Sequence, residues 1–346
     1  MMDIHIRKSG YAGRITLHRP KALNALTYQM TLDIESALDT WIADDAVKLV
    51  VIDAEGERAF CAGGDIRDIY NTAVAGNFEY GRAFWRDEYR LNAKIAAFPK
   101  PFAAFMQGFV MGGGVGISCH GSHRVVCETT QIAMPECGIG LVPDVGGSLL
   151  LARAPGRIGE YLGMTGARMT ADDAIYACFA DTYIPRLKWD EVIATLEATG
   201  DISGITKAAL APGVSKLRGL QAEADALFSR GSFAEVLAAL KNHPGAFAAN
   251  TLKALAKKSP LSVAAIPDLV AASRTAGTLD AALTYEYRFT CRAASDGDLI
   301  EGIKATLIDR SHLPKWRYPT PEDVDQAAID AMLAPLGAHE LTLEAP

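Results

Sequence analysis

The sequence predicts an α/β fold that is followed by a helical C-terminal region. In the first half, short strand signals alternate with amphipathic helix signals, which is typical of a sheet built from strand–helix crossovers. Residues 49–52 (LVVI) form a continuous apolar run, as expected for a parallel strand covered on both faces. From about Met164 onward, strand signals become sparse and alanine-rich amphipathic segments replace them. We place a soft boundary at residue 185, between a core of residues 1–185 and a helical region of residues 186–346.

The individual elements follow from apolar periodicity and from helix-breaking residues. Residues 30–42 carry an apolar stripe at helical spacing, and Pro99 and Pro101 end a helix that begins near Tyr80. A further helix is expected after Cys61. The expected strands are residues 4–6, 14–17, 49–52, 102–105, 124–127 and 132–134, and the expected helices include 30–42, 80–98, 114–120, 214–228, 233–240 and 278–293.

Composition limits the classes of function. Hydrophobic residues make up 49% of the 346 residues and charged residues 22%, which is the profile of a soluble globular protein with a sizeable core. The net charge of -7 argues against a general affinity for nucleic acid or for anionic membranes. The N-terminus lacks the apolar core of a signal peptide, and the six cysteines form no Cys-x-x-Cys pair. We therefore expect reduced thiols and a cytoplasmic location.

One stretch imitates a membrane span, because residues 101–119 contain no charge. The stretch also contains Pro101, Gln107 and five glycines, and its periodicity changes midway. We therefore interpret it as a buried strand, a tight turn and a buried helix instead of a lipid-facing helix.

Two glycine-rich segments are the first candidates for chemistry. Residues 60–65 (FCAGGD) and 111–116 (MGGGVG) each follow a strand-like run and lead toward a helix. Glycine lets the backbone approach a ligand closely, and amides at a helix start point outward with partial positive charge. Two such amides that converge on one point form an oxyanion hole for an enolate or a tetrahedral thioester intermediate. Taken alone, either segment is more often a turn than a site.

Other common site types fit poorly. The third glycine of a dinucleotide-binding fingerprint is missing from residues 111–116, and no Gly-x-Ser-x-Gly elbow surrounds Ser118 or Ser148. The histidines show no ligand spacing, so we assign no metal.

Three carboxylates lie in apolar sequence surroundings. Glu136 and Asp144 fall within residues 134–147, among methionine, isoleucine, leucine and valine, where desolvation would raise the pKa of a carboxyl group. Glu88 shares an apolar helix face with its neighbours three and four residues away. Each has an ordinary alternative, since Asp144 could cap a helix that starts near Gly146 and Glu88 could pair with a neighbouring arginine.

Together these segments resemble the crotonase (enoyl-CoA hydratase/isomerase) superfamily. Four segments carry the resemblance in the family's order, namely residues 18–26 (HRPKALNAL), 60–66 (FCAGGDI), 100–116 and 134–136 (MPE). The resemblance covers about residues 3–185. It implies a crotonase-like spiral of ββα units that binds a coenzyme A (CoA) thioester in a bent conformation.

The resemblance also implies roles for individual residues by their position in these motifs. The backbone amides of Ala62 and Gly113 would hold the thioester carbonyl in an oxyanion hole. The residues implied to contact the substrate are Lys21 and Ala22, beside the nucleotide part of CoA, and Gly63, Gly64, Asp65 and Ile66, along the acyl and pantetheine path.

One position departs from the hydratases of this family. They place one catalytic glutamate where this chain has Gly116 and a second where it has Glu136, so the two-glutamate route of hydration is in doubt. The 3-hydroxyisobutyryl-CoA hydrolases share the glycine and add a second acid after Glu136. Residues 86–92, 139–147 and 298–305 also resemble theirs.

The resemblance therefore implies hydrolysis of a short, branched 3-hydroxyacyl-CoA to the free hydroxy acid and CoA, as in valine breakdown. Glu136 would act as nucleophile or as general base, and Asp144 would assist the hydrolytic step. Glu88 would contact the 3-hydroxyl group or fix the neighbouring acid. The alternatives are an enoyl-CoA isomerase or hydratase of the same fold and a non-catalytic CoA-binding scaffold.

The expected partner is an acyl-CoA, without nucleic acid or membrane. No separate cofactor is expected, because CoA is part of the substrate. Relatives of this fold form trimers and their dimers, so a homo-oligomer remains open.

Overall fold

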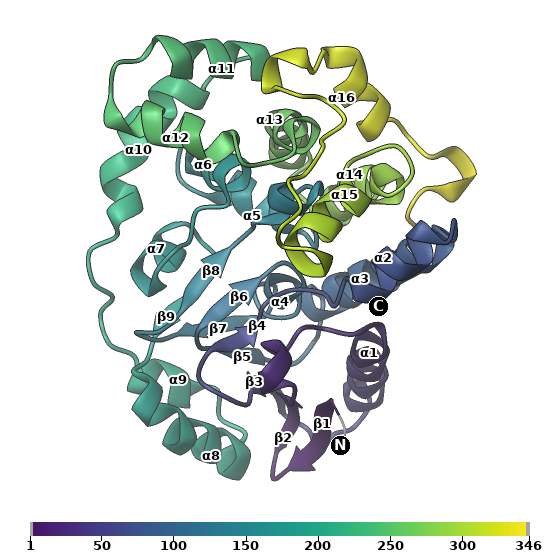
Figure 1. The fold of residues 1–346 in the computed structure, drawn as a ribbon. Helices are drawn as coiled ribbons and strands as arrows, with labels where there is room; N and C mark the ends of the chain where they lie inside the picture. Colours follow the sequence, from purple (N-terminus) through teal and green to yellow (C-terminus); the bar gives the residue numbers. More distant parts are fainter. Residues whose placement is uncertain (1–2, 344–346) are drawn as a thin grey trace.

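Two sheets form the first half of the chain (Figure 1). The computed structural model describes residues 3–343. One sheet has the strand order β1-β2-β3-β5-β7-β9 and the other β4-β6-β8; β1 pairs antiparallel with β2, and the remaining pairs are parallel. The strands are β1 (Ile4–Ser9), β2 (Ala12–Leu17), β3 (Leu49–Ala54), β4 (Ala59–Cys61), β5 (Phe102–Met106), β6 (Phe109–Met111), β7 (His123–Val126), β8 (Gln131–Ala133) and β9 (Thr182–Tyr183).

Helices follow the strand pairs and make up most of the second half. Most of the predicted helices are present with small shifts at their ends, but the one expected over residues 114–120 is only four residues long. The helices are α1 (Tyr28–Ile42), α2 (Arg67–Val74), α3 (Glu79–Ala96), α4 (Gly113–Gly116), α5 (Gly147–Arg153), α6 (Ile158–Thr165), α7 (Ala171–Tyr176), α8 (Trp189–Thr199), α9 (Ser203–Ala208), α10 (Lys216–Phe228), α11 (Phe233–Asn242), α12 (Ala246–Leu255), α13 (Pro260–Ala276), α14 (Leu279–Ala293), α15 (Leu299–Ile303) and α16 (Gln326–Leu333). Shorter helical turns are η1 (Pro20–Ala22), η2 (Glu136–Ile139), η3 (Arg186–Lys188), η4 (Lys304–Ile308), η5 (Pro321–Asp323) and η6 (Gly337–His339).

Successive pairs of strands build a spiral. In each of the pairs β3–β4, β5–β6 and β7–β8, the first strand joins the six-stranded sheet and the second joins the three-stranded sheet. Helices then lead the chain to the next pair. This repeated ββα arrangement, with helices following it, confirms the predicted fold class. Within the described residues, no helix is long and apolar enough to span a membrane, and the uncharged stretch 101–119 folds as β5, β6 and α4.

The apolar run in β3 is explained by cores on both faces of the six-stranded sheet. Val50 and Ile52 belong to the main core, whereas Leu49 and Val51 point the other way, into a smaller core that also contains Trp189 of α8. Because successive side chains of a strand alternate between faces, both sets must be apolar. The prediction of a strand covered on both faces is therefore confirmed.

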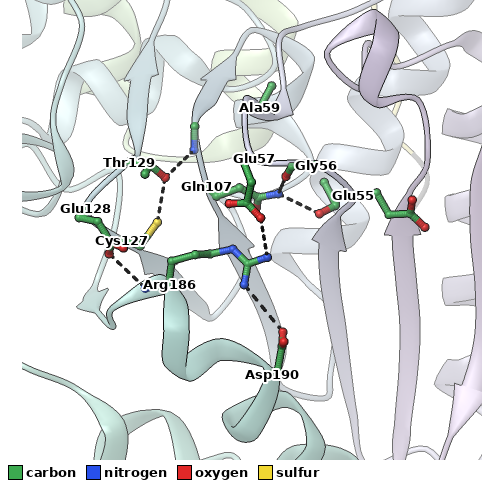
Figure 2. A network of polar contacts seen from close by, with 12 residues as sticks. Glu55, Gly56, Glu57, Ala59, Gln107, Cys127, Glu128, Thr129, Arg186 and Asp190 are labelled. Carbon is green, nitrogen blue, oxygen red and sulfur yellow. Dashed lines mark hydrogen bonds and ion pairs between the residues drawn. The ribbon is translucent and has the colours of Figure 1, made fainter.

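A polar network fixes the loops that lead from one sheet to the other (Figure 2). The side-chain amide of Gln107, between β5 and β6, donates hydrogen bonds of 2.8 Å to the carbonyl oxygens of Ala54 and Gly56 in the preceding turn of the spiral. Arg186 of η3 reaches the same region, where its guanidinium lies 3.4 Å from the carboxylate of Glu57. These contacts hold the strand ends of neighbouring turns in register.

The C-terminal helices pack directly on the spiral. Helix α14 packs on α3, and α15 packs on α2, so that the green and yellow part of the ribbon lies against the blue part (Figure 1). Tyr89 of α3 and Tyr287 of α14 make an edge-to-face contact with ring centroids 6.1 Å apart. The main core therefore contains side chains from both sides of residue 185.

Candidate active site

The small sheet brings the motif segments together. Its three parallel strands end in the segment after Cys61, in the glycines that begin α4, and in the segment that leads to Glu136. Because the carboxyl ends of neighbouring parallel strands meet at one edge of a sheet, segments far apart in sequence become neighbours there.

The two glycine turns touch each other at this edge. Gly63 has φ +113° and Gly112 has φ +48°, which are backbone conformations that favour glycine. An ideal Cβ added to Gly63 would lie 3.5 Å from the carbonyl oxygen of Met111, and one added to Gly113 would lie 3.3 Å from the backbone nitrogen of Gly64. The two turns therefore place the amides of Gly64 and Gly113 close together.

These two amides are free to bind a ligand. Within residues 3–343, neither the Gly64 N–H nor the Gly113 N–H donates a hydrogen bond to the chain. The Ala62 N–H, by contrast, donates to the carbonyl oxygen of Leu23 at 3.0 Å. The expectation that Ala62 supplies the second oxyanion donor is therefore corrected, because its amide is occupied and the Gly64 amide is the one that is free.

A cavity of about 360 Å³ opens beside the two turns. All three carboxylates identified in the sequence line it, together with glycines of both turns, several apolar side chains and one lysine. The lining residues are Ala62, Gly63, Gly64, Ile66, Ile69, Phe84, Trp85, Glu88, Met111, Gly112, Gly113, Pro135, Glu136, Gly138, Ile139, Leu141, Asp144, Lys258 and Thr306.

Glu136, at the start of η2, is buried beside the two glycine turns. The residue is 6% exposed, and its Oε1 atom lies 2.9 Å from the ideal Cβ position of Gly112. Its Oε2 atom has no hydrogen-bond partner among the described residues. Burial, and then the negative charge of Asp144, hold the pKa of the Glu136 carboxyl well above its usual value.

Glu88 approaches the same point from helix α3. It is 3% exposed, and its Oε1 atom lies 2.6 Å from the ideal Cβ position of Gly113, without a partner in the described chain. Burial and the charge of Asp144 raise the pKa of this carboxyl well above its usual value. The alternative ion pair is not formed within residues 3–343, since Arg86 pairs with Glu79, Arg90 pairs with Asp87, and Arg82 donates to the carbonyl oxygen of Cys291.

Asp144 completes the group of acids. The Tyr89 hydroxyl donates a 2.8 Å hydrogen bond to Oδ2 of Asp144, and burial raises the pKa of this carboxyl to about 7. Asp144 does not cap helix α5 with its side chain, since the N-cap residue is Gly146. Instead, the carboxylate of Glu286 accepts hydrogen bonds from the N–H groups of Gly146 (2.7 Å) and Ser148 (2.8 Å).

Position 116 has no room for a side chain. An ideal Cβ on Gly116 would lie 2.7 Å from Nδ2 of Asn92 and 2.8 Å from Cβ of Val145. Distances under 3.0 Å require these neighbours to move. The volume in which other members of the superfamily are expected to place a glutamate is therefore filled by Asn92 and Val145.

Three other predicted contact residues lie outside the cavity wall. Lys21 and Ala22 are exposed on η1, so their contact with the nucleotide part of CoA stays a prediction. The carboxylate of Asp65 pairs with the guanidinium of Arg19 at 3.0 Å, whereas the adjacent Ile66 does line the cavity.

Three contributors to the site were missed in the sequence. Tyr89 adjoins Glu88, but only the fold shows that its hydroxyl reaches Asp144. Lys258 lines the cavity and Glu286 holds the start of α5, and both come from the C-terminal helical region. No local signal marks them, because their partners are more than 100 residues away.

One group of possible metal ligands lies elsewhere in residues 3–343, where His5, His18 and Glu55 come from separate segments. The two imidazole rings stack with centroids 4.4 Å apart, and Nδ1 of His18 lies 2.7 Å from Oε2 of Glu55. The stacking and this polar contact account for the arrangement without an ion.

Curated relatives match this chain over nearly its full length. The 3-hydroxyisobutyryl-CoA hydrolase, mitochondrial, of Danio rerio is 37% identical over 353 residues, which cover 99% of this chain and 92% of that protein. The enzyme of the same name from Homo sapiens is 34% identical and covers 98% of this chain and 90% of its own.

Two solved structures match closely. An enoyl-CoA hydratase from Rhodobacter sphaeroides 2.4.1 has a TM-score of 0.94 and 52% identity, covering 99% of this chain and 100% of that one. A carnitinyl-CoA dehydratase from Mycobacterium thermoresistibile has a TM-score of 0.93 and 40% identity, covering 99% of both chains. A family profile described as enoyl-CoA hydratase/isomerase also matches residues 12–333. The chain therefore belongs to the enoyl-CoA hydratase/isomerase family.

Proposed function

We propose that this protein hydrolyses a short, branched 3-hydroxyacyl-CoA thioester, 3-hydroxyisobutyryl-CoA, to the free hydroxy acid and CoA. The observation that carries the proposal is a cavity lined both by Gly64 and Gly113, whose backbone amides donate no hydrogen bond within residues 3–343, and by three buried carboxylates. The names of the curated relatives support the same reaction.

The two amides would bind the thioester carbonyl. Its oxygen would accept hydrogen bonds from the N–H groups of Gly64 and Gly113, which lie close together where the two turns meet. These donors favour the negative charge that develops on the oxygen as a tetrahedral intermediate forms. Because the turns are fixed by backbone packing, little reorganisation is needed when the substrate binds.

Glu136 would carry out the chemical step in one of two ways. As a nucleophile, its carboxylate attacks the carbonyl carbon, the C–S bond breaks, and CoA leaves as a thiolate that takes up a proton. Water then hydrolyses the mixed anhydride and returns the free carboxylate. As a general base, Glu136 instead removes a proton from a water molecule that attacks the carbonyl carbon directly. Both routes require the ionised form of Glu136.

The other two acids would have supporting roles, Glu88 in substrate binding and Asp144 in the hydrolytic half of the reaction. Asp144, whose pKa burial raises to about 7, can take or give a proton near neutral pH and would assist the water in the hydrolytic half. Glu88, whose Oε1 has no partner in the described chain, would accept a hydrogen bond from the 3-hydroxyl group of the acyl chain. An acyl group without that hydroxyl would leave this buried oxygen unpaired.

A second candidate is the hydration of an enoyl-CoA, which the name of the Rhodobacter sphaeroides structure favours. The packing of Asn92 and Val145 at position 116 weighs against the two-glutamate route. An isomerase needs only one acid and could use Glu136. Turnover of crotonyl-CoA or of a 3-enoyl-CoA would identify either activity.

The pathway and the absence of a separate cofactor are inferred from the proposed substrate. We infer a role in valine breakdown and no cofactor beyond the CoA of the substrate. A cytoplasmic location remains a prediction, since the two animal relatives are named as mitochondrial.

The test is the release of free thiol from 3-hydroxyisobutyryl-CoA, measured beside acetyl-CoA and crotonyl-CoA. We expect rapid release from the hydroxyacyl thioester, slow release from acetyl-CoA, and a loss of about 10²- to 10⁴-fold in the Glu136→Gln variant. Near-normal turnover by this variant would contradict the role of Glu136. Faster turnover of crotonyl-CoA than of the hydroxyacyl thioester would favour the hydratase.

A further inference from the structure

Among the described residues that line the cavity, Lys258 is the one cationic side chain, and it lies in the same wall as the three carboxylates. Lys258 precedes helix α13, more than 100 residues after Glu136 in the chain. It is half-buried, whereas the adjacent Lys257 is exposed and does not line the cavity. Its positive charge must affect the pKa values of the carboxyl groups in the same cavity, because Coulomb interactions are stronger where water is excluded.

The backbone fixes Lys258 against the segment that carries Glu136. The N–H of Ser259 donates a 2.9 Å hydrogen bond to the carbonyl oxygen of Cys137, the residue next to Glu136. The Ser259 hydroxyl in turn donates to the carboxylate of Asp298 at 2.6 Å and accepts from the N–H of Ser262, at the start of α13. Lys258 is therefore attached to the acid-bearing segment by its immediate neighbour.

The end of the lysine side chain lies beside two glycines. Ideal Cβ atoms added to Gly138 and Gly166 would each lie 3.4 Å from Nζ of Lys258. The ammonium group therefore lies over two backbone positions that carry no side chain. Within the described residues, Lys258 forms no salt bridge at the 4.0 Å limit, so it acts on the acids of the cavity through the longer-range attraction of its charge.

We propose that Lys258 is a positioning residue for Glu136, whose ammonium group stabilises the negative charge of the carboxylate inside the cavity. This inference rests on the proposed function, because it assigns Lys258 a task in the step that Glu136 performs. It also goes beyond that function, because the reacting acid lies in the spiral and its counter-charge comes from the helical region.

The charges that face Glu136 act in opposite directions. Burial, Asp144 and then Glu286 raise the pKa of the Glu136 carboxyl, and the charge of Lys258 lowers it. Among the charged side chains that act on Glu136, Lys258 is the one that favours the ionised form. Removing this charge must raise the pKa of Glu136 further and reduce the fraction of active enzyme at neutral pH.

The experiment is the pH profile of kcat/KM for 3-hydroxyisobutyryl-CoA, with the full-length Lys258→Met and Lys258→Arg variants. Methionine keeps most of the unbranched stem of the side chain without its charge, and arginine keeps the charge. Lys257→Met is the matched control. We expect the acid limb of the Met variant to move up by about one pH unit, which is about a tenfold loss below the limb, with recovery at high pH. The Arg variant and the control should retain the wild-type profile.

Other outcomes separate the two proposals. A Lys258→Met profile with an unmoved acid limb overturns the role of Lys258, whether activity is unchanged or falls equally at every pH. A rise in KM alone, with the limb unmoved, also overturns it, because it means that the ammonium contacts the substrate instead. Failure of the wild-type protein to release thiol would instead overturn the proposed function.

Discussion

Two buried glutamates differ in their hydrogen bonding, namely Glu136 at the cavity and Glu286 of helix α14, which contacts the start of helix α5. Glu286 is fully buried, and its carboxylate accepts hydrogen bonds from Gly146 N–H and Ser148 N–H as well as from the Ser148 hydroxyl. Glu136 is also buried, yet one of its oxygens has no partner in residues 3–343.

The difference teaches how to separate structural from reactive carboxylates. Burial raises the pKa of both groups, to about 8 for Glu286, so neither burial nor the direction of the shift distinguishes them. Hydrogen bonding does, because a satisfied carboxylate holds its surroundings together and an unsatisfied one is left to meet a ligand. Asp144, with one bond from Tyr89, lies between the two.

The largest expected effect is on stability at Glu286. Glu286→Ala removes the acceptor for three buried donors and should lower the free energy of unfolding by about 3 kcal/mol. Glu136→Gln should leave it unchanged or raise it, because no bond is lost and a buried charge is removed. Urea denaturation of both variants checks the contrast, and equal destabilisation would break the comparison.

A smaller loss of stability is expected when the packed side of the site is altered. Gly116→Ala places a methyl group against Asn92 and Val145 and should cost about 2 kcal/mol in the free energy of unfolding. The control is Gly219→Ala in helix α10, where an added Cβ meets nothing within 4 Å and should stabilise the helix slightly. Thermal denaturation measures both, and a neutral Gly116→Ala would mean that the neighbours move aside freely.

The smallest effect is expected on catalysis, when the hydrogen bond to Asp144 is removed. Tyr89→Phe removes the hydrogen bond that lowers the pKa of Asp144, so that this pKa rises above about 7. The acid limb of kcat should move to higher pH, and turnover at neutral pH should fall about tenfold. Tyr287→Phe is the control, since its hydroxyl lies 3.2 Å from Arg86 instead. An unmoved limb would show that Asp144 does not limit the reaction.

Much of the site could be predicted from local sequence patterns. The two glycine segments and the three acids lie in short motifs, and the fold brings them to one cavity as expected. The sequence could not show that the free amide belongs to Gly64 and not to Ala62. This depends on whether the carbonyl oxygen of Leu23 accepts a hydrogen bond from the Ala62 N–H. Whether a given N–H is free is a property of the folded backbone and not of the motif.

The helical region was predictable as helix but not as part of the site. Its apolar periodicity indicates α10, α11 and α14 with ends shifted by one or two residues. Periodicity shows which face of a helix is buried, but not what that face meets. Glu286 and Lys258 therefore gave no sign of their roles, since each acts on a segment that is remote in the chain.

The cavity wall is built from both halves of the chain, and this affects which of its residues can be substituted. The amides and the acids come from the spiral, while Lys258 and Thr306 reach the cavity from the other half of the chain. A substitution at Thr306 would reshape this wall without changing the amides or the acids, whereas a substitution at Lys258 would also change the charge that acts on Glu136. If the proposed function holds, position 306 is therefore the natural place to begin a search for variants that accept other thioesters.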